Sequence, residues 1–460
     1  MKNSRQFAAA AAALALAACA VRTPPGSVET PAPPQWYAPL PHGGSLADLT
    51  RWWQQFDDPL LIELITAAQD ASPTVAAAAS RIEQARATRV AAHAALLPSV
   101  DANAQAVRAN QPPLPLSTTV QVGAQTAWEI DLFGGRRAAE RAAAERLRGS
   151  QAGWHEARVS VAAETANAYF DLRSCERQAV VASNDARSRA ETARLTDLSA
   201  KAGFTAPAVA ALARASAAEA AARATQQRAQ CDLDVKALVA LSGIAEPALR
   251  AKLAAPWQEP ESFAQAAVDA VPARAIAQRP DVYRAEREVA AASADVGSAR
   301  ADQLPRLSLS GSIAVGHAWL AGTSVAADTW SIGPLALTLP VFDAGRRAAA
   351  TDAARARYDE AVVQYRSSVR QAVREVEEAL VHLESARERG ADAFTAVEGY
   401  RASFTATEAR YRSGLASLIE LEDQRRSALA AEEALVQLQR ERVGAWVALY
   451  RAVGGGWSRP

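Results

Sequence analysis

The sequence predicts a mainly helical protein, in which two very long helical hairpins continue from β-strands that close into a membrane barrel only when several chains assemble. Three features support this prediction: an internal repeat with an offset of about 210 residues, Ala-rich stretches typical of long helices, and short segments in which apolar and polar residues alternate. Lysine plus arginine and aspartate plus glutamate each number 50, so the formal net charge of +0 gives no argument for a nucleic-acid partner.

The amino terminus, MKNSRQFAAAAAALALAACA, has the pattern of a secretory signal peptide. A basic start and an apolar segment too short to span a bilayer precede small residues and Cys19. This ending resembles the lipobox of bacterial lipoproteins, so we expect residues 1–18 to be removed and Cys19 to be lipidated. The alternative is an ordinary signal peptide with an incidental cysteine. Ala20, in place of an aspartate, indicates retention in the outer membrane, and the prolines that follow indicate an extended or disordered tether over residues 19–45.

Two copies of one structural unit account for most of the chain. The segments WEIDLFGGRRAAE and LTLPVFDAGRRAAA match, and further matching segments keep nearly the same offset. We therefore assign a first repeat to residues 46–242 and a second to residues 276–452. Residues 243–275 are expected to form a linker between the repeats, and residues 453–460 a C-terminal tail.

Each repeat is expected to contribute two strands, because its apolar residues alternate with polar or small ones. In one of them Val120 and Val122 interleave with Gln121 and Gly123. The four predicted strands are residues 100–108, 119–132, 306–316 and 330–342.

A soluble β-sandwich is the alternative explanation of this alternation, with the apolar face buried in a core. Against it, the sequence offers only four such segments and no second sheet to cover them. Strands of this length are typical of membrane barrels, yet an open sheet edge is not tolerated in hydrocarbon. Three chains would supply about twelve strands, enough for a closed barrel with a polar lumen.

The second part of each repeat predicts a long helical hairpin, over residues 136–240 and 346–450. The first helix of each hairpin is free of proline, and Gly203 and Gly414 mark the turns. In the second repeat, apolar residues recur every seven positions, broken only at Gly390, which indicates side-by-side coiled-coil packing. A cytoskeletal coiled coil is the alternative, but the signal peptide and the strands argue against it. The recurring residues are Val362, Val369, Val376, Leu383, Val397, Phe404 and Tyr411.

Two further cysteines follow Cys19. Cys175 precedes the turn at Gly203 by nearly the same distance along the chain as Cys231 follows it, so antiparallel helices place both at similar height. Because the periplasm is oxidising, this placement predicts a disulfide. The alternative is a pair of buried thiols.

No catalytic or metal-binding constellation is recognisable in the sequence. The five histidines are scattered without the spacing of metal ligands, and the Gly-Gly-Arg of the first repeat lacks the Lys-Ser/Thr of a phosphate-binding loop. We therefore expect neither an enzyme nor a cofactor. Glu375, Glu377 and Glu378 are expected on solvated or lumen-facing surface.

Several motifs together resemble the outer-membrane factor family of TolC-type channels, and within it the lipoprotein branch of drug-efflux channels. They are the lipobox, the phrase LTLPVFDAGRRAA with its first copy, and the segment AQRPDVYRAEREVAAASADVGSARADQLPRLSLSGS. The resemblance covers essentially the whole mature chain. It implies a homotrimer with a twelve-stranded barrel, four strands from each chain, continued by a long periplasmic α-barrel with residues 243–275 at its equator.

The resemblance further implies the outer-membrane exit channel of a tripartite efflux system. Such a channel receives drugs or other small toxic compounds from a periplasmic adaptor protein and an inner-membrane pump, commonly of the resistance-nodulation-division class. The expected location is the outer membrane, with lipid around the barrel, a lipid anchor and a large periplasmic part. Two other functions remain open: an exit duct for type I protein secretion, and a structural envelope lipoprotein without a pore.

A periplasmic gate is also implied by the resemblance, at Arg412, Ile419 and Asp423. Ile419 could form an apolar ring from three subunits, while Arg412 and Asp423 tie neighbouring helices together. The alternative for the two charged residues is an ordinary surface ion pair. The first hairpin has Leu212 where the second has Asp423, so the gate would carry one acidic residue per chain.

Two other sets of residues receive roles from the resemblance. The helical turns are expected to dock the adaptor. The junctions between barrel and helices contain arginines that either meet acidic lipid headgroups or form ion pairs at the helix start. The docking residues are Gly203, Phe204, Gly414 and Leu415, and the junction residues are Gly135, Arg136, Arg137, Gly345, Arg346 and Arg347.

Overall fold

The computed structural model describes residues 23–30, 32–33, 35–38, 49–110, 112, 116–255, 257, 276–320 and 323–457. The predicted signal peptide and the predicted lipidation site, Cys19, lie outside these residues. The chain divides into two compact units, each drawn from both halves of the sequence. Unit 1 comprises the described parts of Met1–Thr30, Ala79–Gly153 and Asp281–Ser368, and unit 2 those of Pro31–Ala78, Trp154–Pro280 and Val369–Pro460.

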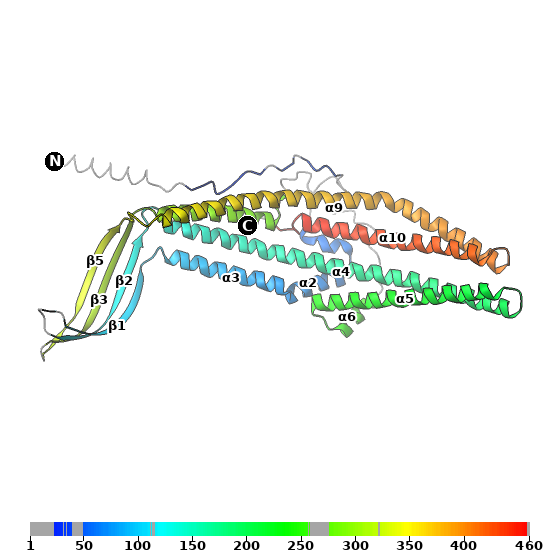
Figure 1. The fold of residues 1–460 in the computed structure, drawn as a ribbon, viewed down its shortest axis with the longest axis horizontal. Coiled ribbons are helices and arrows are strands. Elements are labelled where there is room, and N and C mark those ends of the chain that lie inside the picture. Colours follow the sequence, from blue (N-terminus) through cyan, green and yellow to red (C-terminus); the bar gives the residue numbers. More distant parts are fainter. Residues whose placement is uncertain are drawn as a thin grey trace. The chain divides into compact units, whose positions relative to one another are not determined.

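The order of elements repeats itself, since each half of the chain runs from strands into a long helix and a return helix (Figure 1). The predicted mainly helical class with an internal repeat is confirmed. Within the described residues, none of the helices combines the length with the apolar content needed to cross a bilayer. The elements are η1 (Leu49–Phe56), α2 (Pro59–Ala71), α3 (Pro73–Ala94), β1 (Ser99–Ala109), β2 (Ser117–Ile130), α4 (Gly135–Lys201), α5 (Pro207–Ser242), α6 (Glu246–Leu253), α8 (Pro280–Ala301), β3 (Arg306–Leu320), β4 (Thr323–Ala326), β5 (Thr329–Thr338), α9 (Arg346–Arg412) and α10 (Leu418–Ala452).

Unit 1 contains one antiparallel sheet in which β1, β2 and β3 pair in that order (Figure 1). Both β4 and β5 pair with β3, β4 near its end and β5 along its first part. They are two pieces of one interrupted strand: at the interruption, the Ala327 N–H donates to the Gly316 carbonyl (2.8 Å) and the Asp328 carboxylate accepts from the Gly316 N–H (3.2 Å). The sheet therefore has four strand positions, one of them split.

Some predicted strand ends were wrong. The strand expected over residues 119–132 lies at Ser117–Ile130, because Asp131 caps the next helix instead. The strand expected over 330–342 ends at Thr338, two residues before Pro340, which has no N–H with which to continue a ladder. The strand expected over 306–316 continues to Leu320, where it pairs with the unpredicted β4.

The sheet has one apolar and one polar face, because directly opposed residues point to the same side. Trp330 and Ile332 on the apolar face are 76% and 84% exposed, so no described part of the chain covers this side of β5. The apolar face includes Ala104, Val120, Val122, Ala124, Trp128, Leu309, Ile313, Val315, Trp330, Ile332, Leu335 and Leu337, with Thr126 and His317 among them, and the polar face includes Asp101, Asn103, Gln105, Gln121, Gln125, Ser308, Ser312 and Ser331.

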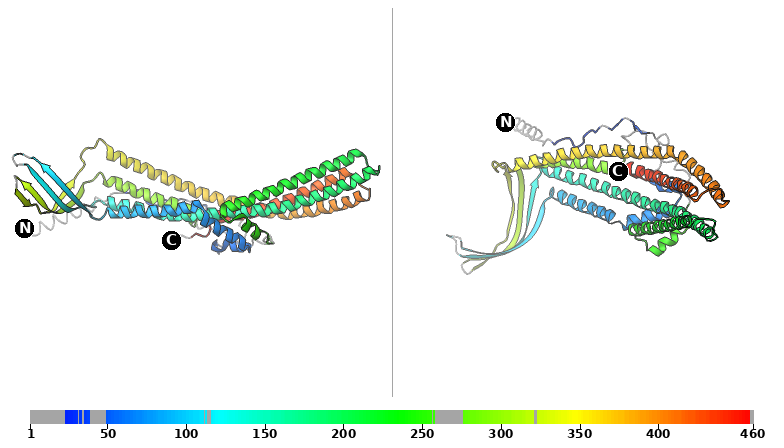
Figure 2. Two further views of the ribbon diagram at one scale, coloured as in Figure 1. Left: turned by 90° about the horizontal axis from the view of Figure 1, so that it is seen from below. Right: turned by 45° about the vertical axis from the view of Figure 1, so that its right-hand side comes forward.

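Two glycines allow β2 and β3 to approach closely on the polar face. A Cβ atom at Gly123 would lie 2.3 Å from the Ile313 carbonyl oxygen, and one at Gly316 would lie 2.2 Å from the Val120 carbonyl oxygen. Glycine in a strand interior often marks such a bend or close approach. The curvature of this sheet (Figure 2) therefore depends on the absence of side chains at these positions.

The helices of unit 1 meet through apolar side chains and, at the start of α4, through a glycine. Val289 and Val296 of α8 pack with Ala354 and Tyr358 of α9 in one buried cluster. Gly135, the first residue of α4, lies so close to the end of α8 that a Cβ atom there would be 2.6 Å from the Ala301 side chain. Such contacts fix the direction in which α4 leaves the sheet.

Unit 2 contains two antiparallel helical hairpins, one from the later part of α4 with α5 and one from the later part of α9 with α10 (Figures 1 and 2). Both α4 and α9 have 67 residues, a length of about 100 Å if straight. The seven-residue periodicity corresponds to packing, since Val369, Val376, Leu383 and Val397 are all buried. The predicted linker over 243–275 contains the helix α6, which buries Leu249 and Leu253.

We predict that Gly123→Ala destabilises the protein by about 1–3 kcal/mol or more, because the new methyl group meets the backbone of β3. Gly390→Ala is the matched control: a Cβ atom there meets nothing within 4 Å, and alanine favours the helix by about 0.5–1 kcal/mol. Thermal unfolding of both purified variants measures the difference. Equal stability of the two variants would show that the close approach of β2 and β3 is not required.

Candidate functional site

The repeated phrase at the two junctions forms a helix cap. Carboxylate oxygens of Asp131 accept hydrogen bonds from the N–H groups of Arg136 (3.1 Å) and Arg137 (3.0 Å). In the second copy, Asp343 accepts from the N–H groups of Gly345 (3.1 Å) and Arg347 (3.2 Å). Each aspartate thus satisfies N–H groups at the start of a long helix, where they have no partner within the helix.

The arginines of the phrase mostly turn back onto acidic neighbours. Arg137 pairs with Asp131 (3.0 Å), Arg347 with Asp343 (2.9 Å) and Arg136 with Glu129 (2.8 Å). Burial by itself would raise the pKa of Asp131, but the hydrogen bonds from Arg137 and Arg136 outweigh it and lower that pKa. Of the two predicted roles, contact with lipid headgroups or ion pairs at the helix start, these contacts favour ion pairs for three of the four arginines. The fourth, Arg346, is exposed.

The two hairpin turns have the same geometry. Gly203 and Gly414 have φ values of +81° and +76°, a conformation that glycine adopts without strain. The Phe204 N–H donates to the Ser199 carbonyl and the Leu415 N–H to the Arg410 carbonyl, which is the bond pattern of a Schellman helix end. Phe204 and Leu415 are 87% and 70% exposed, so each turn presents one large apolar side chain to its surroundings.

The residues predicted to form a gate are exposed within one chain. Ile419 is 65% exposed. Arg412 pairs with Glu408 (3.1 Å) and Asp423 lies 3.7 Å from Arg426, so each charged residue contacts a partner on its own helix. All three side chains are therefore available to a neighbouring chain.

A buried charge cluster close to these residues was missed by the sequence prediction. The Arg189 guanidinium of α4 donates to Asp185 (2.9 and 3.0 Å), to the Ser216 hydroxyl of α5 (2.6 Å) and to Glu422 of α10. Glu422 also accepts from Arg425. We call Asp185, Arg189, Glu422 and Arg425 the inter-hairpin cluster, because it joins helices of both hairpins.

Burial makes this cluster energetically sensitive. Asp185, Arg189 and Arg425 are all buried, and Arg425 also donates to the Thr192 hydroxyl of α4 (3.0 Å). Desolvation lowers the pKa of the Arg425 guanidinium in spite of the nearby Glu422 carboxylate. A buried charge that loses its partner is strongly destabilising. Glu422, which bonds both arginines, is therefore the central acceptor. The sequence does not distinguish Glu422 from its neighbour Asp423, because both belong to one acidic segment. Asp423 is nevertheless exposed.

The expectation for two of the three glutamates on α9 was wrong. Glu375 pairs with Arg279 (2.8 Å), a buried residue that also donates to the Ala452 carbonyl at the end of α10 (2.8 Å). Glu377 accepts the N–H groups of Tyr37 (2.7 Å) and Ala38 (2.8 Å). Both carboxylates serve contacts within the chain, because segments distant in sequence cover them.

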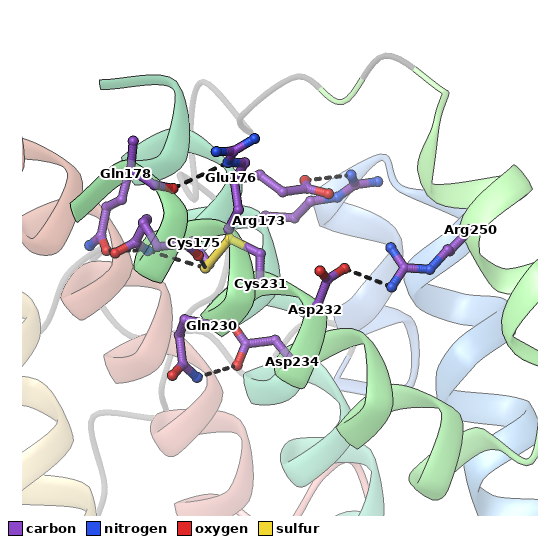
Figure 3. Close-up of a disulfide and its surroundings, with 12 residues drawn as sticks. Arg173, Cys175, Glu176, Gln178, Gln230, Cys231, Asp232, Asp234 and Arg250 are labelled. Carbon is purple, nitrogen blue, oxygen red and sulfur yellow. Dashed lines mark hydrogen bonds and ion pairs between the residues drawn. A yellow bond between two sulfur atoms is a disulfide. The ribbon is translucent and has the colours of Figure 1, made fainter. Parts of the chain in front are cut away.

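Cys175 of α4 and Cys231 of α5 are joined in a disulfide within unit 2 (Figure 3), with their Cα atoms 5.5 Å apart. Gln227 donates an N–H to the Cys175 sulfur (3.2 Å), and nearby Arg173 donates to the Leu253 carbonyl of α6 (3.2 Å). The disulfide thus joins the two helices of the first hairpin, and buried Arg173 beside it joins α4 to α6. Among the described residues, no group of histidine, cysteine, aspartate and glutamate side chains is arranged to hold a metal ion.

Comparison with known proteins supports these observations over nearly the whole chain. The family model described as "Outer membrane efflux protein" matches residues 64–244 and 271–455, one range for each repeat. This chain belongs to the outer membrane efflux protein family. It is accordingly an outer-membrane efflux channel protein with a large periplasmic part and not an enzyme, which confirms the family predicted from the sequence motifs.

Individual relatives and solved structures agree with this assignment. The efflux protein is 31% identical to the pyoverdine export outer membrane protein OpmQ of Pseudomonas putida, over 96% of each chain. It is 30% identical to the outer membrane protein OprJ of Pseudomonas aeruginosa, over 97% of this chain and 94% of OprJ. The solved structure of the outer-membrane channel OprN has a TM-score of 0.85 at 30% identity, covering 96% of this chain and 100% of OprN.

We predict that Cys231→Ser lowers the free energy of unfolding by about 2–4 kcal/mol, because the disulfide restricts the unfolded chain. Thermal unfolding of the purified efflux protein with and without a reductant measures this effect. The reductant should destabilise the wild type and leave Cys231→Ser unchanged; the same response in both would contradict a stabilising role of the disulfide.

We also predict that Glu422→Ala destabilises the efflux protein by about 3–5 kcal/mol, because Arg189 and Arg425 remain buried without their common acceptor. The adjacent substitution Asp423→Ala is the control and should change stability by less than about 0.5 kcal/mol, since this carboxylate is exposed. Urea unfolding of the two variants makes the comparison. Similar losses in both would mean that the cluster is not held by Glu422.

Proposed function

We propose that three copies of this efflux protein form one continuous duct, which receives small toxic organic compounds from a periplasmic adaptor and an inner-membrane pump of the resistance-nodulation-division class. The observation that carries this proposal is the two-faced sheet of unit 1. Within the described residues, β1 pairs only with β2 and β5 pairs only with β3. Both outer edges therefore offer unpaired backbone groups.

Hydrocarbon does not tolerate such edges, whereas pairing β1 of one chain with β5 of the next removes them. Three copies give about twelve strand positions, a size at which the barrel encloses an open lumen. The apolar face would then meet lipid, and the face with Asp101, Gln105 and Gln125 would line the lumen. The same arrangement surrounds the barrel with outer-membrane lipid, to which acylated Cys19 would add an anchor.

The helical turns supply the surface for the adaptor in this proposal. Phe204 and Leu415 are the most exposed large side chains at the two turns, and they lie in equivalent positions of the two repeats. Three chains would therefore present six similar turns, so that the adaptor tips meet a nearly sixfold ring. Exposed apolar side chains in a repeated pattern are typical of a docking surface.

We infer the class of compounds that pass through the duct from the names of the relatives. Their names include pyoverdine export and toluene efflux. The Pseudomonas putida toluene efflux pump protein TtgI is 29% identical to this chain, over 88% of this chain and 87% of TtgI. A duct that serves such different molecules leaves selection to the pump. We therefore propose broad passage of small organic compounds.

We predict that the purified trimer conducts ions across a planar bilayer, and that Arg412→Ala combined with Asp423→Ala raises this conductance. An exposed ion pair contributes about 0.5 kcal/mol, so three copies would shift the balance between open and closed gates about tenfold. Single-channel recording measures both quantities. Size-exclusion chromatography with light scattering establishes the trimer beforehand.

The control is Arg387→Ala, because Arg387 forms an exposed ion pair with Glu384 far along α9 from the turn. This variant should conduct as the wild type does. Unchanged conductance in the double variant would contradict a gating role of Arg412 and Asp423. A stable monomer without conductance would contradict the proposal of a trimeric duct.

A further inference from the structure

Two titratable side chains interrupt the apolar face of the sheet in unit 1, and both lie at the end of the sheet away from the helices (Figure 1). They are Arg108, near the end of β1, and His317, near the end of β3. Arg108 opposes Thr118 and His317 opposes Val120, so the strand register places both on the apolar face. On the described strands, no other residue of this face carries a titratable side chain.

The position of His317 matches the outer end of an apolar band that spans a membrane. On β3, the apolar face begins at Leu307 and continues through Leu309, Ile313 and Val315 before it reaches His317. Ten residues of antiparallel strand extend about 34 Å, which at a tilt of about 40° covers about 25 Å across the membrane. The apolar band of transmembrane barrels has about this height. His317 therefore lies at the level where lipid tails give way to headgroups, in the leaflet away from the periplasmic helices.

Trp319 and Thr118 complete a small group of side chains at this level. The ring centroid of Trp319 lies 6.2 Å from that of His317. Trp319 opposes Thr118, which in turn opposes Arg108, so these three residues form one row across three strands. With strands about 4.8 Å apart, the Cα atom of Arg108 lies about 10 Å from that of Trp319 and about 12 Å from that of His317. We call Arg108, Thr118, His317 and Trp319 the outer basic patch.

The guanidinium of Arg108 has no counter-charge within the described part of the chain. The residue is exposed, and none of the described residues accepts a hydrogen bond from its side chain or pairs with it. Asp328, at the interruption between β4 and β5, accepts from the Gly316 N–H instead (3.2 Å). At the opposite end of the sheet, by contrast, Arg137 pairs with Asp131 (3.0 Å). A cation on the lipid side of a barrel is tolerated near the interface, where it reaches anionic headgroups. The anion that balances Arg108 therefore comes from outside the chain.

We propose that the outer basic patch binds the phosphate of an outer-leaflet glycolipid, lipid A of lipopolysaccharide; this inference rests on the proposed trimeric barrel, whose apolar face meets lipid. The Arg108 guanidinium donates two N–H groups to phosphate oxygens, a geometry that suits its planar fork. His317 donates a ring N–H in either charge state, and Thr118 adds a hydroxyl. Trp319 packs at the interface beside the sugar, as amphipathic rings do. Phospholipids of the inner leaflet have their phosphates at the other end of the apolar band, about 25 Å away.

The proposal is tested by native mass spectrometry of the purified, delipidated trimer, titrated with diphosphorylated lipid A and with the same lipid after dephosphorylation. We expect up to three molecules of lipid A for each trimer, bound at least about tenfold more tightly than the dephosphorylated lipid, because charge-assisted hydrogen bonds are lost with the phosphate. Arg108→Gln should weaken lipid A binding about tenfold, and Arg108→Lys should restore most of the affinity. The matched control is Arg81→Gln, which removes the same charge from an exposed arginine of α3 and should leave binding unchanged.

Two further ligands identify the source of the phosphate. Phosphatidylglycerol, an anionic phospholipid, should bind at least about tenfold more weakly than lipid A, because it offers a single phosphate. Inorganic phosphate in large excess should not displace lipid A, since Trp319 and the apolar face also hold the lipid. Equal binding of phosphorylated and dephosphorylated lipid A would overturn the proposal, as would equal losses in Arg108→Gln and Arg81→Gln. Equal affinity for phosphatidylglycerol, or displacement by inorganic phosphate, would contradict lipid A as the occupant.

A spin label at Ile313→Cys separates this inference from the proposed barrel. Ile313 lies between Leu307 and His317 on the apolar face and is 60% exposed. In the reconstituted trimer, the label should be more accessible to oxygen, which concentrates in lipid, than to a water-soluble nickel complex. A lipid-exposed label together with phosphate-independent binding of lipid A would overturn the outer basic patch alone. A water-exposed label would overturn the barrel, and the patch with it.

Discussion

The open edges of the sheet are the constraint on which the rest of this molecule depends. Backbone N–H and C=O groups cannot remain unpaired in hydrocarbon, and the described strands of one chain do not close on themselves. A membrane barrel therefore requires several copies. The helical hairpins must then follow the same symmetry, because α4 and α9 begin within a few residues of β2 and β5. The Asp131 and Asp343 caps lie at these junctions and fix where each long helix begins after its strand.

Tandem duplication gave the chain two similar hairpins that are held by different contacts within the chain. Their turns have the same backbone conformation at Gly203 and Gly414. Their contacts differ, since the first hairpin is tied by a disulfide, whereas the second is held by Arg279 and Glu375 near its base. The inter-hairpin cluster then joins the two hairpins through Glu422. Glu422 of this cluster and the gate candidate Asp423 are adjacent on α10, so any rearrangement of the proposed gate would act on the contacts between the hairpins.

Neighbouring acidic residues illustrate how much burial decides. Glu422 and Asp423 are adjacent in sequence and carry the same charge, but one binds two buried arginines and the other is 59% exposed. The same holds for Glu377 and Glu378 on α9, of which the first accepts the N–H groups of Tyr37 and Ala38 and the second lies 3.6 Å from Arg374 on its own helix. A helix rotates by about 100° at each residue, so adjacent side chains point to different surroundings. Charge composition therefore does not indicate how much such residues contribute to the stability of the fold.

The sequence by itself determined the class of the fold, the repeat, the four strand positions and the two turns. These follow from local rules: period-two alternation, proline-free Ala-rich stretches, and glycine at a left-handed turn. It also identified Cys175 and Cys231, because antiparallel helices relate height to distance along the chain. Only the tertiary structure decided the ends of the strands, the split into β4 and β5, and the partners of Glu375, Glu377 and Glu422. Each of these depends on segments that are far apart in sequence, and no periodicity along one segment specifies which distant segment will cover it.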